Sequence, residues 1–380
     1  MSLYRRIVRP ILFKCDPEKC HNGVIRALEL AGRVRLGGCM LGAGRNFSDQ
    51  RLETTVCGVK FKNPLGLAAG FDKSGRALAG LAQLGLGHVE IGSVSADISH
   101  GNPKPRLWRL IDDRAILVHY GVPNDGAETV ANRLVKKTTP MPVGINIVKT
   151  NKGLHAAPES DEEIAQDYLR AIRRLKDSGN YLALNLSCPN TTHERDFFAV
   201  RGNTRCLLIE AAKLGIHVPV FLKVAASGGV ERIESLLEEV DGLDMISGFA
   251  FNLTPERPAN LRTPRKVWEN RRGAISGKPI ETIMNTAISN LHARIDPRRY
   301  QIIGSGGIFT AEDAYLKIRL GASLVQILTV LIYEGPGIVN TINRGLSQLL
   351  TRDGFSNVAQ AVGTLKNPAA ALAAGLVGTT

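Results

Sequence analysis

Eight short apolar runs, rich in β-branched residues, recur along most of the chain and alternate with stretches of helical periodicity. The runs cover residues 63–69, 88–93, 142–148, 181–187, 219–225, 246–253, 300–306 and 324–329. Near-continuous apolar strands separated by helices are typical of a parallel sheet that is covered on both faces. Eight such repeats within about 250 to 300 residues predict an α/β fold, a (β/α)8 TIM barrel.

An open, doubly wound α/β sheet is the alternative architecture. Against it, no G-x-G-x-x-G sequence follows the first apolar run. Apolar residues make up 44% and charged residues 22% of the 380, which excludes a disordered or coiled-coil chain. The six cysteines show no C-x-x-C spacing, so we predict no metal site, no disulfide framework and a reducing compartment.

The chain is strongly basic, with 48 Lys and Arg residues against 35 Asp and Glu residues, a formal net charge of +13. Eight basic and three acidic residues fall within the first 40 positions, so part of the excess is concentrated there. Such a charge favours anionic partners. Because no nucleic-acid-binding motif is present, we expect no nucleic acid among them.

The first 40 residues predict a small helical extension. Asp16 followed by Pro17 is a helix start, the next helix is expected to close at Gly32, and a more apolar segment before it is broken by Pro10. This extension is either a helical pair packed on the main domain or a basic amphipathic patch on a membrane surface. No run of 18 uncharged apolar residues exists. We therefore expect an extension at 1–40, a barrel at 41–363 and an irregular tail at 364–380.

Polar residues lie at or just after the carboxyl end of each predicted strand. In a TIM barrel the active site lies at these strand ends. The residues at these positions are Lys73, Ser93, Asn146, Asn185, Ser187, Cys188, Lys223, Asn252, Thr254, Gly306, Gly307 and Thr329. Any single asparagine among them could be a loop cap. Three together offer donors and acceptors to a flat, amide-rich ligand.

Two glycine-rich segments, 273–277 and 305–307, are predicted loops whose backbone N–H groups could hold a phosphate, although a plain turn would need glycine too. Lys73 and Lys223 are expected on strands at the barrel mouth, where each ammonium needs an anion unless it reaches the rim. Cys188 is either an inert buried thiol or an acid/base that overlooks the pocket.

Several strings, in order, closely resemble the dihydroorotate dehydrogenase family over about residues 4–363. They are NPLGLAAGFDKSG, GNPKPRLWRL, NLSCPNT, GAISGKP, IIGSGGIFTAEDAYLKIRLGASLVQILT and LIYEGPGIVNTINRGLSQLL. The N-terminal segment RPILFKCDPEKCHNGVIRALELAG and the GNPKPRL string make the chain similar to the class 2, quinone-linked, membrane-associated branch.

The resemblance implies a barrel that holds FMN and oxidises dihydroorotate to orotate, a step of pyrimidine biosynthesis. A base removes the C5 proton, the C6 hydrogen passes to the flavin as hydride, and a quinone that enters at the N-terminal extension takes the electrons. It implies FMN contacts from Ala69, Gly70, Ser93, Asn146, Asn185, Lys223, Ser276, Gly277, Gly306, Gly307 and Thr329. Substrate contacts are expected from Lys73, Asn185, Asn190, Thr191 and Asn252, with Cys188, Lys73 and Lys223 in catalysis.

The sequence departs from the class 2 pattern at the substrate site. Cys188 stands where that branch has serine, Val118 and Val122 replace an asparagine and a phenylalanine, and Leu253 replaces a small or hydroxylated residue. Two alternatives therefore stay open: a family member that oxidises or reduces another small cyclic or unsaturated substrate, and a flavin-binding barrel without turnover that serves as an interaction protein. The expected location is peripheral on the cytoplasmic side of the inner membrane, or the cytoplasm.

Overall fold

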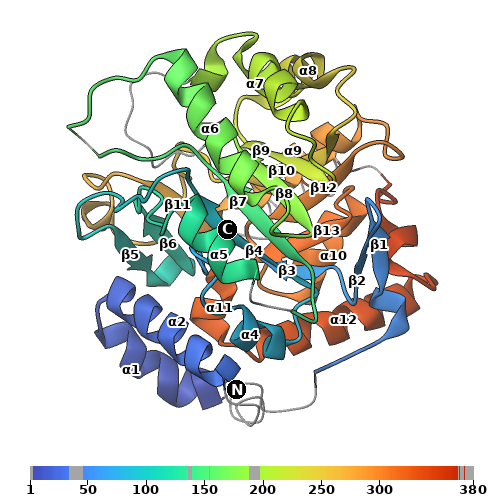
Figure 1. Ribbon diagram of the computed structural model, residues 1–380. Helices are drawn as coiled ribbons and strands as arrows, with labels where there is room; N and C mark the ends of the chain where they lie inside the picture. Colours follow the sequence, from blue (N-terminus) through green and yellow to red (C-terminus); the bar gives the residue numbers. More distant parts are fainter. Residues whose placement is uncertain are drawn as a thin grey trace.

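Eight parallel strands close into a barrel in the computed structural model, which describes residues 3–33, 46–135, 139–153, 155–187, 197–366, 368 and 372 (Figure 1). Going round the barrel, the strands are β3 (Leu65–Leu67), β4 (His88–Val94), β7 (Val143–Ile147), β8 (Tyr181–Asn185), β9 (Val220–Ala225), β10 (Ile246–Asn252), β12 (Gln301–Ser305) and β13 (Leu324–Ile327). Strand β13 pairs with β3 and completes the circle. Each predicted run coincides with one of these strands, β4 extending one residue past its run, so the TIM barrel is confirmed.

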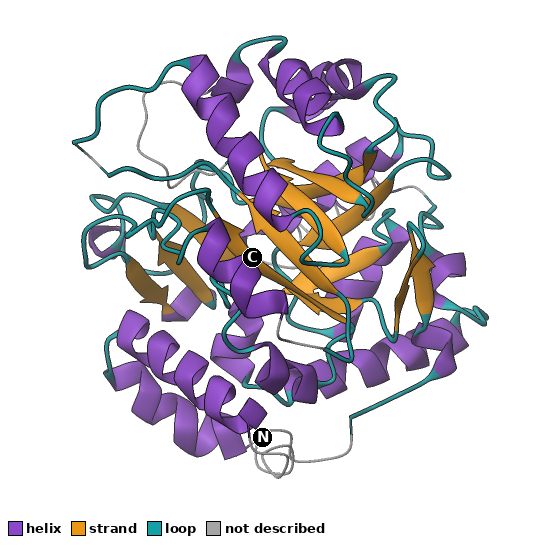
Figure 2. Ribbon diagram, viewed as in Figure 1, coloured by secondary structure: helices purple, strands orange, loops and turns teal. Residues whose placement is uncertain are grey.

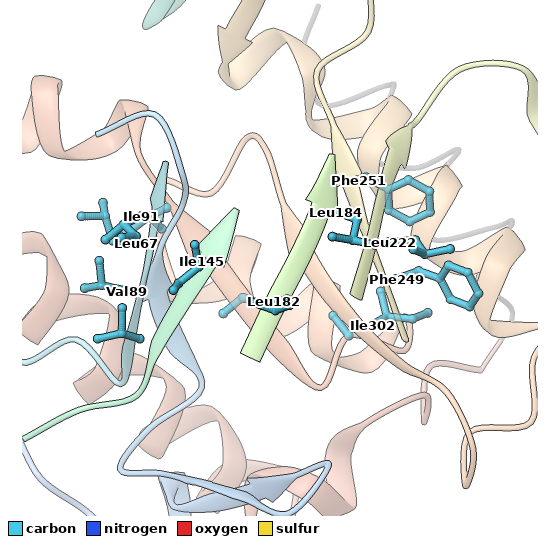
Figure 3. Packing of buried hydrophobic residues seen from close by; sticks show 14 of the residues in the cluster. Leu67, Val89, Ile91, Ile145, Leu182, Leu184, Leu222, Phe249, Phe251 and Ile302 are labelled. Atoms are coloured by element: carbon cyan, nitrogen blue, oxygen red, sulfur yellow. The ribbon is translucent and has the colours of Figure 1, made fainter. Parts of the chain in front are cut away.

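Helices surround the barrel on the outside (Figures 1 and 2). They are α4 (Leu78–Leu81), α5 (Ala127–Val135), α6 (Asp161–Leu175), α7 (Asn203–Ala212), α8 (Gly229–Val240), α9 (Glu281–His292), α10 (Ala311–Arg319), α11 (Thr329–Glu334) and α12 (Ile338–Arg352). Short helical turns are η3 (Gln50–Leu52), η4 (Ala82–Leu84), η5 (Ile111–Asp113), η6 (Phe197–Ala199), η7 (Arg265–Val267), η8 (Lys278–Ile280) and η9 (Val358–Ala361). The main core includes Val89, Ile91, Ile145, Leu182 and Leu222 from these strands (Figure 3).

A hairpin of β1 (Thr54–Val56) and β2 (Val59–Phe61) packs on the amino ends of the barrel strands. Its Val56 and Phe61 join Tyr181, Phe221 and Ile303 in a separate apolar cluster. The hairpin thereby covers the end of the barrel opposite to the polar strand ends, and leaves the carboxyl ends as the open side.

A second small sheet is antiparallel and consists of β5 (Leu107–Leu110), β6 (Ala115–Val118) and β11 (Ala274–Gly277). The prediction that 273–277 is a loop was wrong for 274–277, because this segment pairs with β6 and buries Ile275 in a cluster with Leu117. The partner strand lies more than 150 positions earlier, so no local signal could reveal the pairing.

The N-terminal extension folds as a π-helical turn η1 (Tyr4–Val8), helix α1 (Arg9–Lys14) and helix α2 (Pro17–Arg33). Pro17 begins α2 as predicted, but Gly32 does not end it. Gly32 lies within the last turn, where an added Cβ would come 2.6 Å from the Ala79 Cβ, so glycine lets α2 approach α4 closely. Within the described ranges, no helix is both long and apolar enough to cross a membrane.

The helical pair packs on the main body through polar contacts as well. Arg106 donates to both carboxylate oxygens of Glu18 on α2, and both side chains are buried. Arg9 donates to the Tyr333 carbonyl oxygen at 3.2 Å. Most of the predicted tail, including 373–380, lies outside the described residues, so its irregular structure and the proposed domain limits stay predictions.

Candidate active site

A cavity of about 120 Å³ opens at the carboxyl ends of the barrel strands. Among the residues that line it are eight predicted site residues: Ala69, Lys223, Asn252, Ser276, Gly277, Gly306, Gly307 and Thr329. They come from six separate segments of the chain. The fold therefore brings most of the expected cofactor contacts to one place.

One side of this cavity has the donors and the close backbone that a phosphate needs. The Ser276 and Thr329 hydroxyl oxygens are 2.9 Å apart. Gly306 and Gly307 have φ angles of 82° and 76°, and an added Cβ on Gly307 would lie 2.4 Å from the Glu281 Cβ. Only glycine fits there, and its backbone can approach an anion closely.

The three asparagines singled out in the sequence meet in one hydrogen-bonded chain. Asn252 Nδ2 donates to Asn185 Oδ1 at 2.9 Å, and Asn185 Nδ2 donates to Ser93 Oγ at 3.3 Å. The Ser93 hydroxyl donates to Asn146 Oδ1. These four side chains come from four barrel strands, so the predicted cluster forms.

Lys223 is buried as predicted, and its partner is a carboxylate that the sequence analysis missed. Its Nζ lies 2.9 Å from Glu90 Oε1, and Glu90 is 0% exposed. Burial raises the pKa of Glu90, but the Lys223 charge and hydrogen bonds from Gln326 and Asn146 outweigh it and hold the pKa below its ordinary value.

Three more polar side chains fill the barrel interior below Glu90. Gln326 Nε2 donates to Glu90 Oε2 at 3.0 Å, and the Tyr181 hydroxyl donates to the same oxygen at 3.4 Å. His88 Nε2 lies 3.4 Å from Gln326 Nε2, and burial lowers the pKa of His88 to about 4. The interior therefore contains a polar column that leads up to the predicted site.

The structure places Lys73 in a turn after β3, where it does not line the cavity at the strand ends, so the prediction that it lies on a strand was wrong. Its Nζ is 2.9 Å from His21 Nε2 on α2 and 4.2 Å from the Tyr120 ring centre. Burial lowers the pKa of Lys73 to about 8. Burial and the Lys73 charge hold the pKa of His21 well below its ordinary range.

The remaining predicted residues are distributed as follows. Gly70 lies beside the mouth, where it lines a neighbouring apolar cavity. Cys188, Asn190 and Thr191 lie outside the described residues, so their roles stay predictions. Ser187, just before them, donates its backbone N–H to Asn185 Oδ1 at 3.3 Å.

The neighbouring cavity measures about 320 Å³ and is enclosed by the N-terminal helices and the barrel mouth. Its lining is mainly apolar, including Leu12, Val24 and Leu28, with His21 and Arg109 as polar groups. Leu328 lines both this cavity and the one at the strand ends. The two cavities are therefore neighbours, with the Leu328 side chain in the wall of both.

No group of three or more His, Cys, Asp or Glu side chains in the described part of the chain is placed to hold a metal ion. A closed parallel barrel, with polar side chains and glycine turns gathered at the strand ends, defines the class of the protein: a TIM-barrel enzyme.

Comparison with known proteins places the chain within this class. The sequence profile of the family described as dihydroorotate dehydrogenase matches residues 51–350. A protein of Haloarcula marismortui named dihydroorotate dehydrogenase (quinone) is 38% identical over 359 residues, which cover 94% of this chain and 98% of the relative. A protein of the same name from Rhodospirillum rubrum is 36% identical over 371 residues, covering 96% and 95%.

A solved structure agrees with the sequence comparison. The crystal structure of DHODH from Eimeria tenella in complex with ferulenol has a TM-score of 0.78 at 28% identity and covers 92% of this chain and 95% of its own. The chain belongs to the dihydroorotate dehydrogenase family and is an oxidoreductase that acts on CH–CH bonds.

Proposed function

We infer that this protein oxidises dihydroorotate to orotate, with FMN as its cofactor and a quinone as the electron acceptor. The observation that carries this proposal is the convergence of the expected cofactor residues, from distant parts of the chain, around one cavity at the strand ends. The names of the relatives supply the substrate and the acceptor.

The residues at the mouth fit FMN. Ser276, Thr329 and the backbone of Gly306 and Gly307 would hold the phosphate, since they combine hydroxyl donors with a close backbone. Lys223, which lines the cavity and pairs with Glu90 beneath it, would lie at the flavin ring, together with Ser93 and Asn146. Bound FMN supplies a hydride acceptor at the barrel mouth.

The amides hold the substrate, and Cys188 accepts its proton. Asn185 and Asn252 are already linked by a hydrogen bond, and together with Asn190, Thr191 and Lys73 they would bind the ring carbonyls and the carboxylate. The Ser187 backbone N–H donates to Asn185 Oδ1, and Cys188 is the next residue in the sequence. The proposed base therefore directly follows a residue that contacts the amide cluster. Lys73 would have to leave His21 to take part.

The apolar cavity between α1, α2 and the mouth suits a quinone. Its size of about 320 Å³ is within the range of small-molecule sites, and its lining is mostly apolar. Leu3, Ile7, Ile11 and Leu30 of the same helices are exposed, next to basic residues such as Arg6 and Lys14. We propose that this face rests on the membrane, which gives a water-insoluble acceptor access to the cavity.

The test is an anaerobic flavin spectrum of the purified full chain. We expect a yellow protein whose flavin absorbance is bleached by dihydroorotate and restored by a soluble quinone. A yellow protein that dihydroorotate does not bleach would contradict the proposed substrate and favour another small cyclic compound. A colourless protein that cannot be reconstituted with FMN would contradict the cofactor and favour an interaction protein.

A further inference from the structure

We propose that Glu90 is a positioning residue that fixes the direction of the hydrogen-bond chain through the site amides and balances the charge of Lys223. The proposal rests on the proposed function for the identity of the ligands. It concerns a residue of β4 that lies below the cavity at the strand ends and does not line it.

Glu90 receives donors from four other barrel strands. Oε1 accepts from Lys223 Nζ on β9 and from Asn146 Nδ2 on β7, both at 2.9 Å. Oε2 accepts from Gln326 on β13 at 3.0 Å and from Tyr181 on β8 at 3.4 Å. The side chain is 0% exposed, so these four groups take the place of water around a buried charge.

An ionised carboxylate can only accept hydrogen bonds, and this sets the direction of every bond above it. Asn146 must turn its NH₂ group to Glu90, so its Oδ1 faces Ser93. The Ser93 hydroxyl donates its only hydrogen to that oxygen, so towards Asn185 Nδ2 it can act only as an acceptor. Asn185 Oδ1 is left to accept from Asn252.

Two backbone groups at the far end of the chain agree with this direction. A backbone N–H can only donate, and those of Ser187 and Leu253 point at Asn185 Oδ1 and Asn252 Oδ1, at 3.3 and 3.0 Å. The carboxylate at one end and the two N–H groups at the other therefore impose the same orientation. A glutamine at position 90 could offer its own NH₂ group to Asn146, so the direction at the Asn146 and Ser93 end would no longer be fixed and only the two N–H groups would still hold the other end.

Glu90 also determines how much positive charge Lys223 presents to the mouth. The two side chains form a buried ion pair, 6% and 0% exposed, whose field partly cancels at a distance. Replacing the carboxylate with a neutral amide leaves the ammonium uncompensated. The negative charge of a reduced flavin is then favoured more strongly than in the unchanged protein.

The experiment compares Glu90→Gln with the unchanged holoenzyme in two equilibrium measurements. We expect the dissociation constant of orotate, titrated by the flavin spectrum, to rise by about tenfold or more, since charge-assisted hydrogen bonds that orient the amides are lost. We also expect the flavin midpoint potential to become more positive. A purely structural residue would lower stability and leave both values unchanged.

Tyr181→Phe is the matched control, because it removes a donor from Oε2 and leaves the Lys223 and Asn146 contacts to Oε1 in place. Its dissociation constant for orotate should stay within about twofold of that of the unchanged protein. Its flavin midpoint potential should equal that of the unchanged protein within experimental error. An unchanged or more negative potential in Glu90→Gln, or an unchanged orotate affinity, overturns the proposal.

A third variant covers the case in which Glu90→Gln does not retain FMN. Glu90→Asp keeps the charge and the acceptor-only character with one methylene less, so its midpoint potential should equal that of the unchanged protein, and a shifted potential overturns the proposal. Failure of the proposed function looks different: the unchanged protein would then not bind FMN, or would bind FMN but not orotate.

Discussion

His88 is a fully buried imidazole on β4, and burial lowers its pKa to about 4, from an ordinary value near 6.5. Below pH 6.5 the His88 imidazole is protonated in the unfolded chain but stays neutral in the folded protein. The folded state therefore loses stability as the pH falls from 6.5 to 4, by about 2 to 3 kcal/mol from this residue alone.

Replacing His88 with glutamine should remove this part of the acid sensitivity. We expect the difference between the free energies of unfolding at pH 7 and pH 4.5, measured by urea titration, to shrink in His88→Gln by about 2 kcal/mol. His217→Gln, at an exposed position, controls for the loss of one imidazole. An equal pH dependence in both variants and the unchanged protein would contradict the buried, neutral state of His88.

Cys188 is the proposed proton acceptor, and its replacement tests that role directly. In Cys188→Ala we expect the rate at which dihydroorotate reduces the flavin to fall by about 10²- to 10⁴-fold, the usual contribution of a general base. Cys206→Ala, at an exposed position on α7, should leave this rate unchanged. Rapid-mixing absorbance measurements provide the rates. A full rate in Cys188→Ala would assign the proton to another group.

The residues at strand ends could be predicted, whereas those inside the barrel could not. The sequence singles out Asn146, Asn185 and Asn252 because a polar side chain at the end of an apolar strand needs hydrogen-bond partners. Glu90 and His88 share one face of β4 and alternate with Val89 and Ile91, whose side chains belong to the main core. This alternation lies within 88–93, where the apolar residues on the other face make the segment resemble one continuous apolar run.

At the scale of elements, two barrel strands use glycine to admit rings from their neighbours. An added Cβ on Gly66 of β3 would lie 2.2 Å from the His88 ring, and one on Gly144 of β7 would lie 2.0 Å from the Tyr181 ring. The polar column inside the barrel therefore depends on missing side chains in the adjacent strands.

Gly144→Ala should accordingly destabilise the barrel, by about 1 to 3 kcal/mol or more, because the rigid ring has to move. Gly23→Ala is a matched control on the exposed side of α2, where nothing lies within 4 Å of the added Cβ. It should stabilise the protein by up to about 1 kcal/mol, since alanine is the better helix former. Chemical unfolding measures both, and a tolerated Gly144→Ala would contradict the packing around Tyr181.

Helix α2 forms one wall of the apolar cavity, and a larger side chain on that wall tests the proposed quinone site. Val24→Trp should slow the reoxidation of the reduced flavin by a soluble quinone by about tenfold or more, because the indole would occupy space that the acceptor needs, and a loss of about 1.4 kcal/mol in binding is already tenfold. Reduction by dihydroorotate should be unaffected. Val135→Trp, on the exposed side of α5, is the control. Equal reoxidation rates in both variants would place the acceptor elsewhere.

The main elements were predictable because each barrel strand is a short and largely apolar run. The antiparallel sheet of β5, β6 and β11 escaped prediction because its pairing joins residues 115–118 to 274–277. The end of α2 was misplaced at Gly32 because glycine there serves a close approach to α4, a tertiary contact that local helix signals do not report.

On the scale of the whole molecule, the N-terminal helices lie at one corner, beside the mouth of the barrel and away from the β1–β2 hairpin (Figure 1). Leu3, Ile7 and Ile11 are 69%, 54% and 61% exposed there. In the proposed membrane docking, these exposed apolar side chains would insert into an anionic membrane. The same helices enclose the apolar cavity, so membrane and acceptor site would share one wall.

Membrane binding of the intact chain should therefore depend on this corner. Replacing both Ile7 and Ile11 with glutamate should lower binding to phosphatidylglycerol-containing vesicles by about tenfold or more, because insertion of each isoleucine contributes about 1.5 to 3 kcal/mol and the new charges repel the lipid. Val135→Glu, at an apolar position that is 79% exposed elsewhere, should bind as the unchanged protein does. Co-sedimentation at low and high salt measures the affinities. If the double variant and the Val135→Glu control sediment equally with the vesicles, the membrane contacts another face of the barrel, and the acceptor must reach the cavity by a different entrance.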